Sequence, residues 1–396
     1  MDGNSLSSPT PFTPPTTEED RLAWLRLIRS RRVGPGTFAR LMAEHGSADA
    51  ALAALPGIAR AAGIDDYAPC PIDQAMREYQ AGRKAGARLI CLGDPDYPTP
   101  LAAISDAPPV LWALGRRVVL NRPAVAVVGA RNASSLGQRT ARRMAEGIGH
   151  HGFVVVSGLA RGIDTIAHGA ALQTGTLAVM AGGVDQVYPA ENAVLAAAIA
   201  DQGLRVSEQP IGMQAQARHF PRRNRIIAGL SLGVIVIEAA ESSGSLITAR
   251  NAMDQGREVL AVPGHPLDPR AAGCNILIRD GARLVRNTED VIDAIGPSAT
   301  TSTARQALDP SNRRASPAKA ASPHPTPAPP GTPPARSPDT LTLHRLILDR
   351  LGSAPLAEDQ LIRDMGLPAA TLAPALLFLE LDGRVHRQPG GLLSRC

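Results

Sequence analysis

The sequence predicts an α/β protein in which a Rossmann-like parallel sheet is flanked by an N-terminal helical domain and a C-terminal winged helix. The main observation is that short runs of valine, isoleucine and leucine alternate with helical stretches between residues 124 and 295. Uninterrupted apolar runs are typical of strands buried on both faces of a parallel sheet, and strand–helix–strand order implies right-handed crossovers. Short helices joined by glycine-containing turns precede this region, and three helices and a hairpin follow it.

The composition of the 396-residue chain indicates two or three domains with an ordinary core, since 44% of the residues are hydrophobic. The net charge of +5 is compatible with an anionic partner but does not prove one. The four cysteines are scattered without a CxxC pair, so we expect no disulfide framework, no zinc site and no cofactor. Because there is no signal-peptide pattern and no apolar run long enough to span a bilayer, we expect a cytoplasmic protein without a membrane partner.

The N-terminal part is expected to begin with a disordered tail, because residues 1–15 are rich in proline, serine and threonine. Residues 16–80 then predict a small helical domain. Thr16 and Glu19 have the spacing of a capping box, and the turns VGPGTF and ALPGI break the helices. Glycine-containing turns between short helices resemble helix-hairpin-helix or SAM-like modules, but they are equally typical of a plain helical packing domain.

Residues 81–295 are expected to form the Rossmann-like domain. Six strands are predicted, with the sequences AVAVVG, FVVVSG, TLAVMAGG, LRVSEQ, GVIVIEA and EVLAVPG. In open parallel sheets, ligands bind beyond the carboxyl ends of the strands. The turns that follow these six runs are therefore where we expect a binding site.

The C-terminal part predicts a linker and a winged helix. Residues 296–338 are dominated by proline, alanine, serine and threonine, which is typical of an extended linker. Residues 339–396 predict three helices and a β-hairpin that turns at residues 389–391, which is the order of elements in a winged helix. Such modules often bind DNA through the third helix. Here that helix, ATLAPALLFLELD, carries no basic residue, so we favour a protein-contact or structural role for it.

Small residues and arginines follow the strands of the predicted sheet. The candidates after the first two strands are Gly129, Arg131, Ser157, Gly158, Arg161 and Gly162. A third turn, AESSGSLITA, places small hydroxylated residues before a helix. Backbone N–H groups at such helix starts attract phosphate. Together the turns predict a phosphate-lined groove, although neither the GxxxxGK[ST] motif nor the full GxGxxG motif is present.

The stretch HFPRRNRIIAGLS, residues 219–231, concentrates arginines beside one aromatic residue. Arg223 and Arg225 are candidates to clamp backbone phosphates, and Phe220 is a candidate to stack on a base. In the alternative interpretation, Phe220 belongs to the core and the arginines form surface ion pairs. We favour the nucleic-acid interpretation because residues 218–225 contain no carboxylate that would pair with the arginines.

One histidine and three carboxylates are the other titratable candidates. His168 follows Asp164 by four residues on a predicted helix, and we favour a packed or capping histidine over a general base. Asp164, Glu208 and Glu238 lie near strand ends, where they form acid–base pairs or brace the arginines, and we favour the second role. The spacing indicates no nucleophile–base pair and no metal ligands, so no catalytic or metal-binding residue is predicted.

Eight segments resemble the DNA-processing protein A family (DprA, also called Smf). They are, in order, VGARNASSLG, SGLARGIDTIAH, GGVDQVYPAEN, SEQP, FPRRNRIIAGLS, VIEAAESSGSLITA, AVPG and GCNILIRDGA. The resemblance extends from about residue 20 to residue 295, and LLFLELDGRV and PGG are similar to the winged-helix domain of many members. The segment GGLLSRC lacks the aromatic residue that the family often carries there, so the resemblance implies no function for the wing.

The resemblance implies a non-enzymatic protein that binds single-stranded DNA, protects it during natural transformation and helps to load the RecA recombinase. It also implies a homodimer formed through the Rossmann-like domain. By motif position, the residues implied to contact DNA are Arg131, Arg161, Phe220, Arg223, Asn224 and Arg225, with Gly158 and Gly162 allowing close approach and Ser245 and Thr248 at the pocket edge. The family often has lysine at the position of Arg161, so the charge is kept there while the geometry differs.

An enzyme acting on nucleoside monophosphates is the alternative function. Related Rossmann-like proteins of the lysine-decarboxylase-like type cleave such compounds and typically carry PGGxGT followed by a glutamate. The comparable segment here is SSGSLITA, with no glutamate in the next turn, which argues against hydrolysis. A transcription regulator is a third possibility, which depends only on the winged helix.

Overall fold

The computed structural model describes most of the chain outside its N-terminal tail and the region before the winged helix. The described residues are 13–296, 340–351, 356–368, 371–372, 375–376, 379, 384–388 and 392–395. Nearly all of the predicted tail and the predicted linker therefore lie outside the described residues. The chain divides into two compact units, Met1–Pro310 and Ser311–Cys396.

The first unit is built on a nine-stranded sheet. Its strands are β1 (Arg88–Cys91), β2 (Val110–Gly115), β3 (Ala124–Gly129), β4 (Val154–Ser157), β5 (Thr176–Val179), β6 (Leu204–Ser207), β7 (Gly233–Ile237), β8 (Glu258–Ala261) and β9 (Arg283–Leu284). The six predicted strands are confirmed as β3 to β8, and they pair in parallel. The sheet also contains strands that were not predicted, and at one edge β1 and β2 pair antiparallel to each other and β2 pairs antiparallel to β6.

The strand order places a switch in winding direction at the centre of the sheet. The order is β1-β2-β6-β5-β4-β3-β7-β8-β9, so the chain winds outward from β3 in one direction and from β7 in the other. Strands β3 and β7 pair with Gly129 opposite Ile237 at their carboxyl ends. Crevices at such switch points are the usual ligand sites of open α/β sheets.

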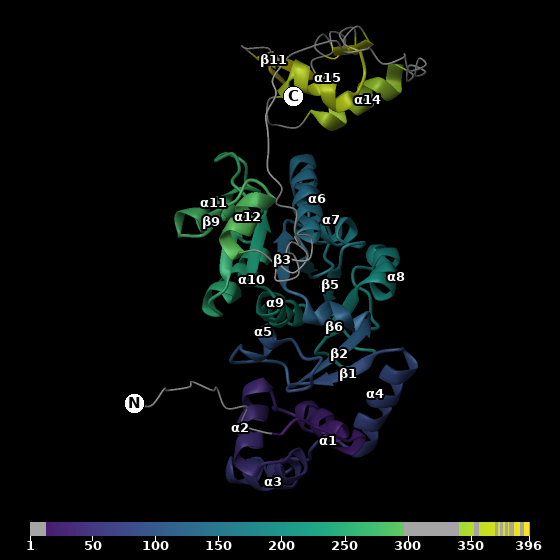
Figure 1. Ribbon diagram of the computed structural model, residues 1–396, viewed down its shortest axis with the longest axis vertical. Helices are drawn as coiled ribbons and strands as arrows, with labels where there is room; N and C mark the ends of the chain where they lie inside the picture. Colours follow the sequence, from purple (N-terminus) through teal and green to yellow (C-terminus); the bar gives the residue numbers. More distant parts are fainter. Residues whose placement is uncertain are drawn as a thin grey trace, which may run out of the picture. The chain divides into compact units, whose positions relative to one another are not determined.

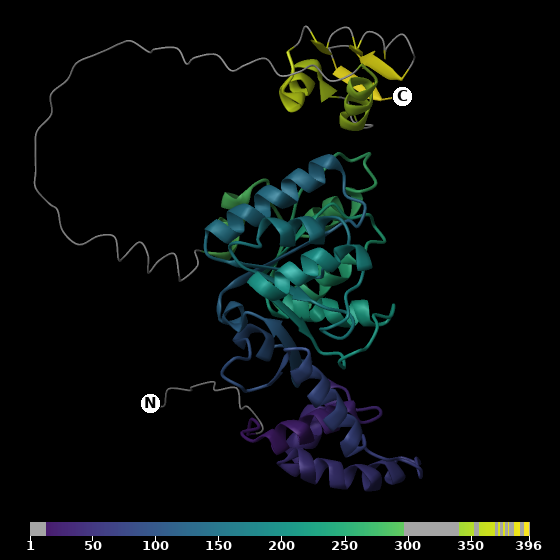
Figure 2. The ribbon, with the colours of Figure 1, turned by 90° about the vertical axis from the view of Figure 1, so that its right-hand side faces the viewer.

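Helices cover both faces of the sheet. The helices that follow the amino-terminal domain are α5 (Thr99–Ala102), α6 (Ser135–His150), α7 (Ile163–Ala170), α8 (Ala193–Gln202), α9 (His219–Gly229), α10 (Ser245–Asp254), α11 (Ala272–Arg279) and α12 (Thr288–Ile295), with 3-10 turns at Arg117–Asn121 and Ala190–Asn192. Figure 1 shows α9, α10 and α11 on one side of the sheet and α6, α7 and α8 on the other, and Figure 2 turns the second group toward the viewer.

The alternation of side chains along each strand explains the two layers. Val127 and Val155 belong to the core cluster that includes α6 and α7, while Val128 and Val156 belong to the cluster that includes α9 and α10. Successive side chains of a strand point to opposite faces, so a run in which every residue is apolar buries both faces.

The amino-terminal helices share a core with the antiparallel edge of the sheet. They are α1 (Glu18–Arg29), α2 (Pro35–His45), α3 (Ala48–Ala61) and α4 (Ile72–Lys84). Leu25 and Phe38 of this domain lie in the same buried cluster as Trp112 of β2. The predicted capping box is shifted by one residue, because Thr17 is the N-cap of α1 and Asp20 completes the box.

The second unit contains the described part of the predicted winged helix. It comprises α14 (Thr340–Arg350), α15 (Glu358–Met365), β10 (Leu356–Ala357), β11 (Val385–Gln388) and β12 (Leu392–Arg395). The predicted hairpin is confirmed by the antiparallel pairing of β11 with β12, while its turn at residues 389–391 lies outside the described residues. No helix in the described part of the chain combines the length and apolarity needed to cross a bilayer.

Candidate nucleic-acid interface

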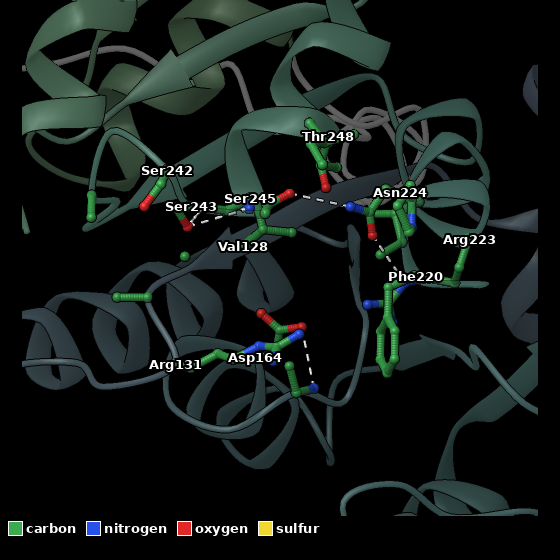
Figure 3. A pocket seen from close by; sticks show the side chains of 18 of the residues that line it. Val128, Arg131, Asp164, Phe220, Arg223, Asn224, Ser242, Ser243, Ser245 and Thr248 are labelled. Atoms are coloured by element: carbon green, nitrogen blue, oxygen red, sulfur yellow. Dashed lines mark hydrogen bonds between the residues drawn. The ribbon is translucent and has the colours of Figure 1, made fainter. Parts of the chain in front are cut away.

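A pocket of about 810 Å³ lies at the switch point between β3 and β7. Its walls come from the loop after β3, the start of α7, helix α9 and the loop that leads into α10. The predicted residues that line it are Gly129, Arg131, Phe220, Arg223, Asn224, Ser245 and Thr248. Figure 3 shows the serines, Thr248 and Asn224 on one wall and Arg131 and Asp164 on the facing wall, with Phe220 beside the opening between them.

Phe220 lies among two guanidinium groups and a second aromatic ring. The Cζ atoms of Arg131 and Arg223 are 5.6 Å and 5.9 Å from the centroid of the Phe220 ring, which is within cation–π range. The ring of Tyr188 meets it edge-on at 5.7 Å and an angle of 62°. Phe220 itself is half-buried, so part of the ring remains available to a ligand.

Arg223 is a buried structural cation of the pocket wall. Its Nη1 donates to the carbonyl oxygens of Gly158 at 2.6 Å and Val179 at 2.8 Å, and its Nε donates to Asn224 Oδ1 at 3.1 Å. Burial lowers the pKa of Arg223 to about 10, while the negative charge of Asp164 opposes that shift. The guanidinium therefore stays charged at neutral pH, and it already makes three hydrogen bonds within the protein.

The predicted glycines make room for the protein's own groups. A Cβ on Gly158 would overlap the guanidinium of Arg223, and a Cβ on Gly129 would overlap the carbonyl oxygen of Ile237 on β7. Gly162 has a φ of +73°, and a Cβ there would overlap backbone carbonyl oxygens of the β3 loop. The space left by the missing Cβ atoms of Gly158 and Gly162 is thus filled by side-chain and backbone atoms of the chain, while Gly158 also lines a second, smaller cavity.

Arg225 does not join the pocket. Its Nη2 lies 2.5 Å from Glu208 Oε2 and its Nε lies 3.2 Å from Asp106 Oδ2, and its side chain is only 12% exposed. The expectation that these arginines lack carboxylate partners is wrong for Arg225, because the partners come from the residue after β6 and from the loop before β2. Arg225 therefore forms ion pairs, as the alternative interpretation of this stretch expected, although its side chain is mostly buried.

Arg161 and Ser157 lie at the margin of the site. Arg161 is exposed and lines a second cavity of about 40 Å³ beside Phe220, where its Nε pairs with Glu191 Oε1 at 2.7 Å. Ser157 is fully buried and donates to the carbonyl oxygen of Val127 at 2.6 Å, so its hydroxyl links two strands and does not face either cavity.

The other titratable candidates have structural partners. Leu159 N–H donates to His168 Nε2 at 3.3 Å, so Nδ1 carries the proton and donates to Thr176 Oγ1 at 2.7 Å. His168 is fully buried, which confirms a packed histidine, and burial lowers its pKa to about 3. Glu208 braces Arg225 as expected, whereas Glu238 accepts hydrogen bonds from the backbone and hydroxyl of Ser134.

Asp164 is the carboxylate that lines the pocket. Its Oδ2 accepts hydrogen bonds from the backbone N–H groups of Gly158 at 3.0 Å and Ala160 at 3.3 Å. Burial raises its pKa, and the charge of Arg223 and these hydrogen bonds oppose the rise. No group of three or more histidine, cysteine, aspartate or glutamate side chains suited to a metal ion occurs in the described residues.

Sequence reasoning missed Tyr188 and Ser243 as pocket residues. Tyr188 lines both cavities and is 53% exposed, and Ser243 lines the larger one beside Ser245. The signal for Tyr188 was present in the segment VYPAEN, where an aromatic residue precedes a proline in the loop that follows β5. It was not used because the distance in sequence from Tyr188 to Phe220 hides their contact.

Comparisons with known proteins identify the family of this chain. Residues 88–296 match the family model of DNA recombination-mediator protein A, residues 18–81 match a DprA-like N-terminal HHH domain, and residues 323–391 match a DprA winged helix domain. The chain belongs to the DprA family. The resemblance read from the eight segments is thereby confirmed, as is the predicted order of a helical domain, a Rossmann-like sheet and a winged helix.

The DprA relatives match over long stretches. Protein Smf of Synechocystis is 36% identical over 334 residues, which cover 80% of this chain and 81% of that protein. DNA processing protein DprA of Bacillus subtilis is 42% identical over 222 residues, or 55% of this chain and 75% of that protein. The crystal structure of DprA from Streptococcus pneumoniae superposes with a TM-score of 0.54 and 37% identity, covering 69% of this chain and 93% of the other.

Proposed function

We propose that this chain is a recombination mediator that binds single-stranded DNA in the pocket at the switch point. In this proposal the protein acts in the cytoplasm, protects incoming strands and helps to load RecA during natural transformation. It acts without catalysis and as a homodimer. The loading of RecA, the role in transformation and the dimer come from the resemblance to the DprA family, whereas the DNA site is argued from the pocket itself.

The observation that carries the DNA site is the position of Phe220 at the pocket, with Arg131 and Arg223 on its ring. A ring of this kind offers a stacking surface for a nucleobase, and stacking tolerates any base. In a duplex the bases already stack on each other, so an unpaired strand is the better ligand.

The charges around the pocket support the same ligand. Arg131 is exposed, lines both cavities and has no carboxylate partner among the described residues. Its five N–H donors match the oxygens of a phosphate. The guanidinium of Arg131 is therefore the best candidate for a contact with the sugar-phosphate chain, and Phe220 for a contact with a base of the same strand.

Fluorescence anisotropy with labelled single-stranded and double-stranded DNA tests the proposal, with salt titrations of wild type, Arg131→Ala and Phe220→Ala. Wild type is expected to prefer the single strand, and both variants to bind it more weakly. Arg143→Ala is the matched control, because Arg143 is exposed on α6 and lines neither cavity. Equal binding of wild type and both pocket variants would remove the pocket from the DNA interface.

The alternative, an enzyme that acts on nucleoside monophosphates, is tested by incubating the protein with each monophosphate and measuring the released base. The pocket offers little support for hydrolysis, because the hydrogen bonds to Asp164 come from backbone amides that hold it in place. We expect no release of base. Release that is lost on Asp164→Asn exchange would favour the enzyme.

A further inference from the structure

Two loops that line the pocket also pack into the core of the amino-terminal domain, which consists of α1 to α4. The loop after β5 carries Tyr188, and the loop between β6 and α9 carries Ala215, and both residues line the pocket. Val184 of the first loop is fully buried in the cluster that holds the amino-terminal helices, and Ile211 of the second loop packs against that cluster. Each loop therefore contacts the amino-terminal domain with one part and forms the pocket with another.

The two loops are also bonded to each other. The backbone N–H of Gly183 donates to the carbonyl oxygen of Met213 at 2.7 Å. The backbone N–H of Gly212 donates to Asp185 Oδ1 at 2.9 Å. Because these bonds join the loops close to Val184, a shift of one loop is expected to move the other.

Arg29 of α1 links the amino-terminal domain to the beginning of the second loop. Its Nε and Nη2 both donate to the carboxylate of Glu78 at 2.9 Å, and its Nη1 donates to the carbonyl oxygen of Glu208 at 3.1 Å. The side chains of Arg29 and Glu78 are only 12% and 10% exposed, and a bidentate pair of this kind has a fixed geometry. Glu208 is the first residue after β6, and its carboxylate pairs with Arg225 of α9. Arg29 therefore holds the backbone at the point from which the second loop and α9 follow.

We propose that the amino-terminal domain sets the shape of the pocket, with Arg29 and Val184 as positioning residues. Neither side chain lines either cavity, so both act through the loops and not on the DNA. This inference rests on the proposed function and extends it, because it makes the affinity for a single strand depend on α1 to α4. Among the described residues, these four helices supply no lining residue of either cavity.

Hydrogen exchange of the full chain without DNA, measured by mass spectrometry, tests the positioning role. Arg29→Ala removes the bond to the second loop, so exchange is expected to become faster in residues 183–189 and 208–217. Arg21→Ala is the matched control, because Arg21 lies on the same helix and pairs with Asp94 through two bonds of 2.6 Å and 2.8 Å. Asp94 follows β1 and belongs to neither loop. Equal exchange of these loops in the two variants overturns the proposal.

A second pair of variants separates positioning from a general loss of stability. Val184→Ala and Val33→Ala each remove two methyl groups from the same buried cluster, and both are expected to lower the stability. Val33 lies in the turn between α1 and α2, whereas Val184 lies in a pocket loop. Faster exchange in residues 183–189 is therefore expected for Val184→Ala alone. The same exchange of these residues in both valine variants would contradict the role of Val184.

Binding of a labelled oligothymidylate connects the positioning role to the proposed function. Arg29→Ala and Val184→Ala are expected to bind about three- to thirtyfold more weakly than wild type, the usual range for residues that act through a network of contacts. Arg21→Ala and Val33→Ala are expected to bind like wild type. Unchanged affinity of Arg29→Ala and Val184→Ala overturns the dependence of binding on the amino-terminal domain.

The salt dependence of binding separates positioning from direct contact. The slope of log affinity against log salt is expected to be the same for Arg29→Ala and wild type, because Arg29 neutralises no phosphate. A flatter slope would make Arg29 a DNA contact and overturn its positioning role. If wild type binds no single strand, the proposed function fails, and the exchange measurements still decide whether the amino-terminal domain holds the two loops.

Discussion

The guanidinium of Arg223 lies against the backbone of Gly158, with Nη1 2.6 Å from the Gly158 carbonyl oxygen. This contact joins the end of β4 to helix α9, and it exists because residue 158 has no Cβ. The same guanidinium lies 5.9 Å from the Phe220 ring. The position of the proposed stacking surface therefore depends on a glycine more than 60 residues earlier in the chain.

Gly158→Ala is expected to destabilise the protein, because the new methyl group would overlap a buried guanidinium that already makes its hydrogen bonds. Overpacking of this kind typically costs about 1–3 kcal/mol. Urea unfolding measures the loss, and single-strand binding is expected to weaken in parallel as Arg223 and Phe220 move. Gly169→Ala in α7 is the control, because no atom lies near its Cβ position and alanine favours a helix. Equal stability of both variants would contradict this account.

Arg131→Ala is expected to change DNA binding, whereas Arg225→Ala is expected to lower the stability of the protein. Loss of Arg131 removes a phosphate contact, so the slope of log affinity against log salt falls by about 0.7 for a single strand. Loss of Arg225 leaves Glu208 in a buried position without its partner, so the free energy of unfolding falls by a few kcal/mol. The salt slope of Arg225→Ala is expected to stay at the wild-type value, and a flatter slope would place Arg225 on the DNA.

Phe220→Ala is expected to lower the affinity for single strands of any sequence by about 1–3 kcal/mol, the usual value of one stacked base. Stacking releases no counterions, so the salt slope is expected to stay unchanged. Phe220→Trp supplies the comparison, because it keeps an aromatic surface and should retain binding. Weak binding by both variants, or a flatter slope, would assign Phe220 a role in packing instead.

The buried His168 predicts a dependence of stability on acid. Its pKa of about 3 in the folded chain lies below the ordinary value of 6.5. Between these two pH values the histidine is protonated in the unfolded chain but not in the folded chain. The contribution is complete above pH 6.5 and is lost as the pH falls toward 3, by up to about 1.4 kcal/mol per pH unit. His168→Gln should be less stable at pH 7, and its free energy of unfolding should depend less on pH in this range. Urea titrations at several pH values measure this dependence, and a wild-type slope in His168→Gln would refute the assignment.

The sequence by itself determined the six parallel strands and the turns that follow them, because hydrophobic runs and glycine turns are local signals. It did not reveal β1 and β2, since Arg88–Cys91 is a short strand whose pairing depends on distant residues. It also predicted that Arg131 and Phe220 lie near each other, and in the structure the Arg131 guanidinium is 5.6 Å from the Phe220 ring.

Only the tertiary structure decided what each arginine does. Arg223 and Arg225 are two residues apart in sequence. Arg223 lies in the wall of the pocket, whereas Arg225 forms ion pairs with Asp106 and Glu208. No local pattern contains those carboxylates, because burial and ion pairing are set by residues that come together only in the folded chain.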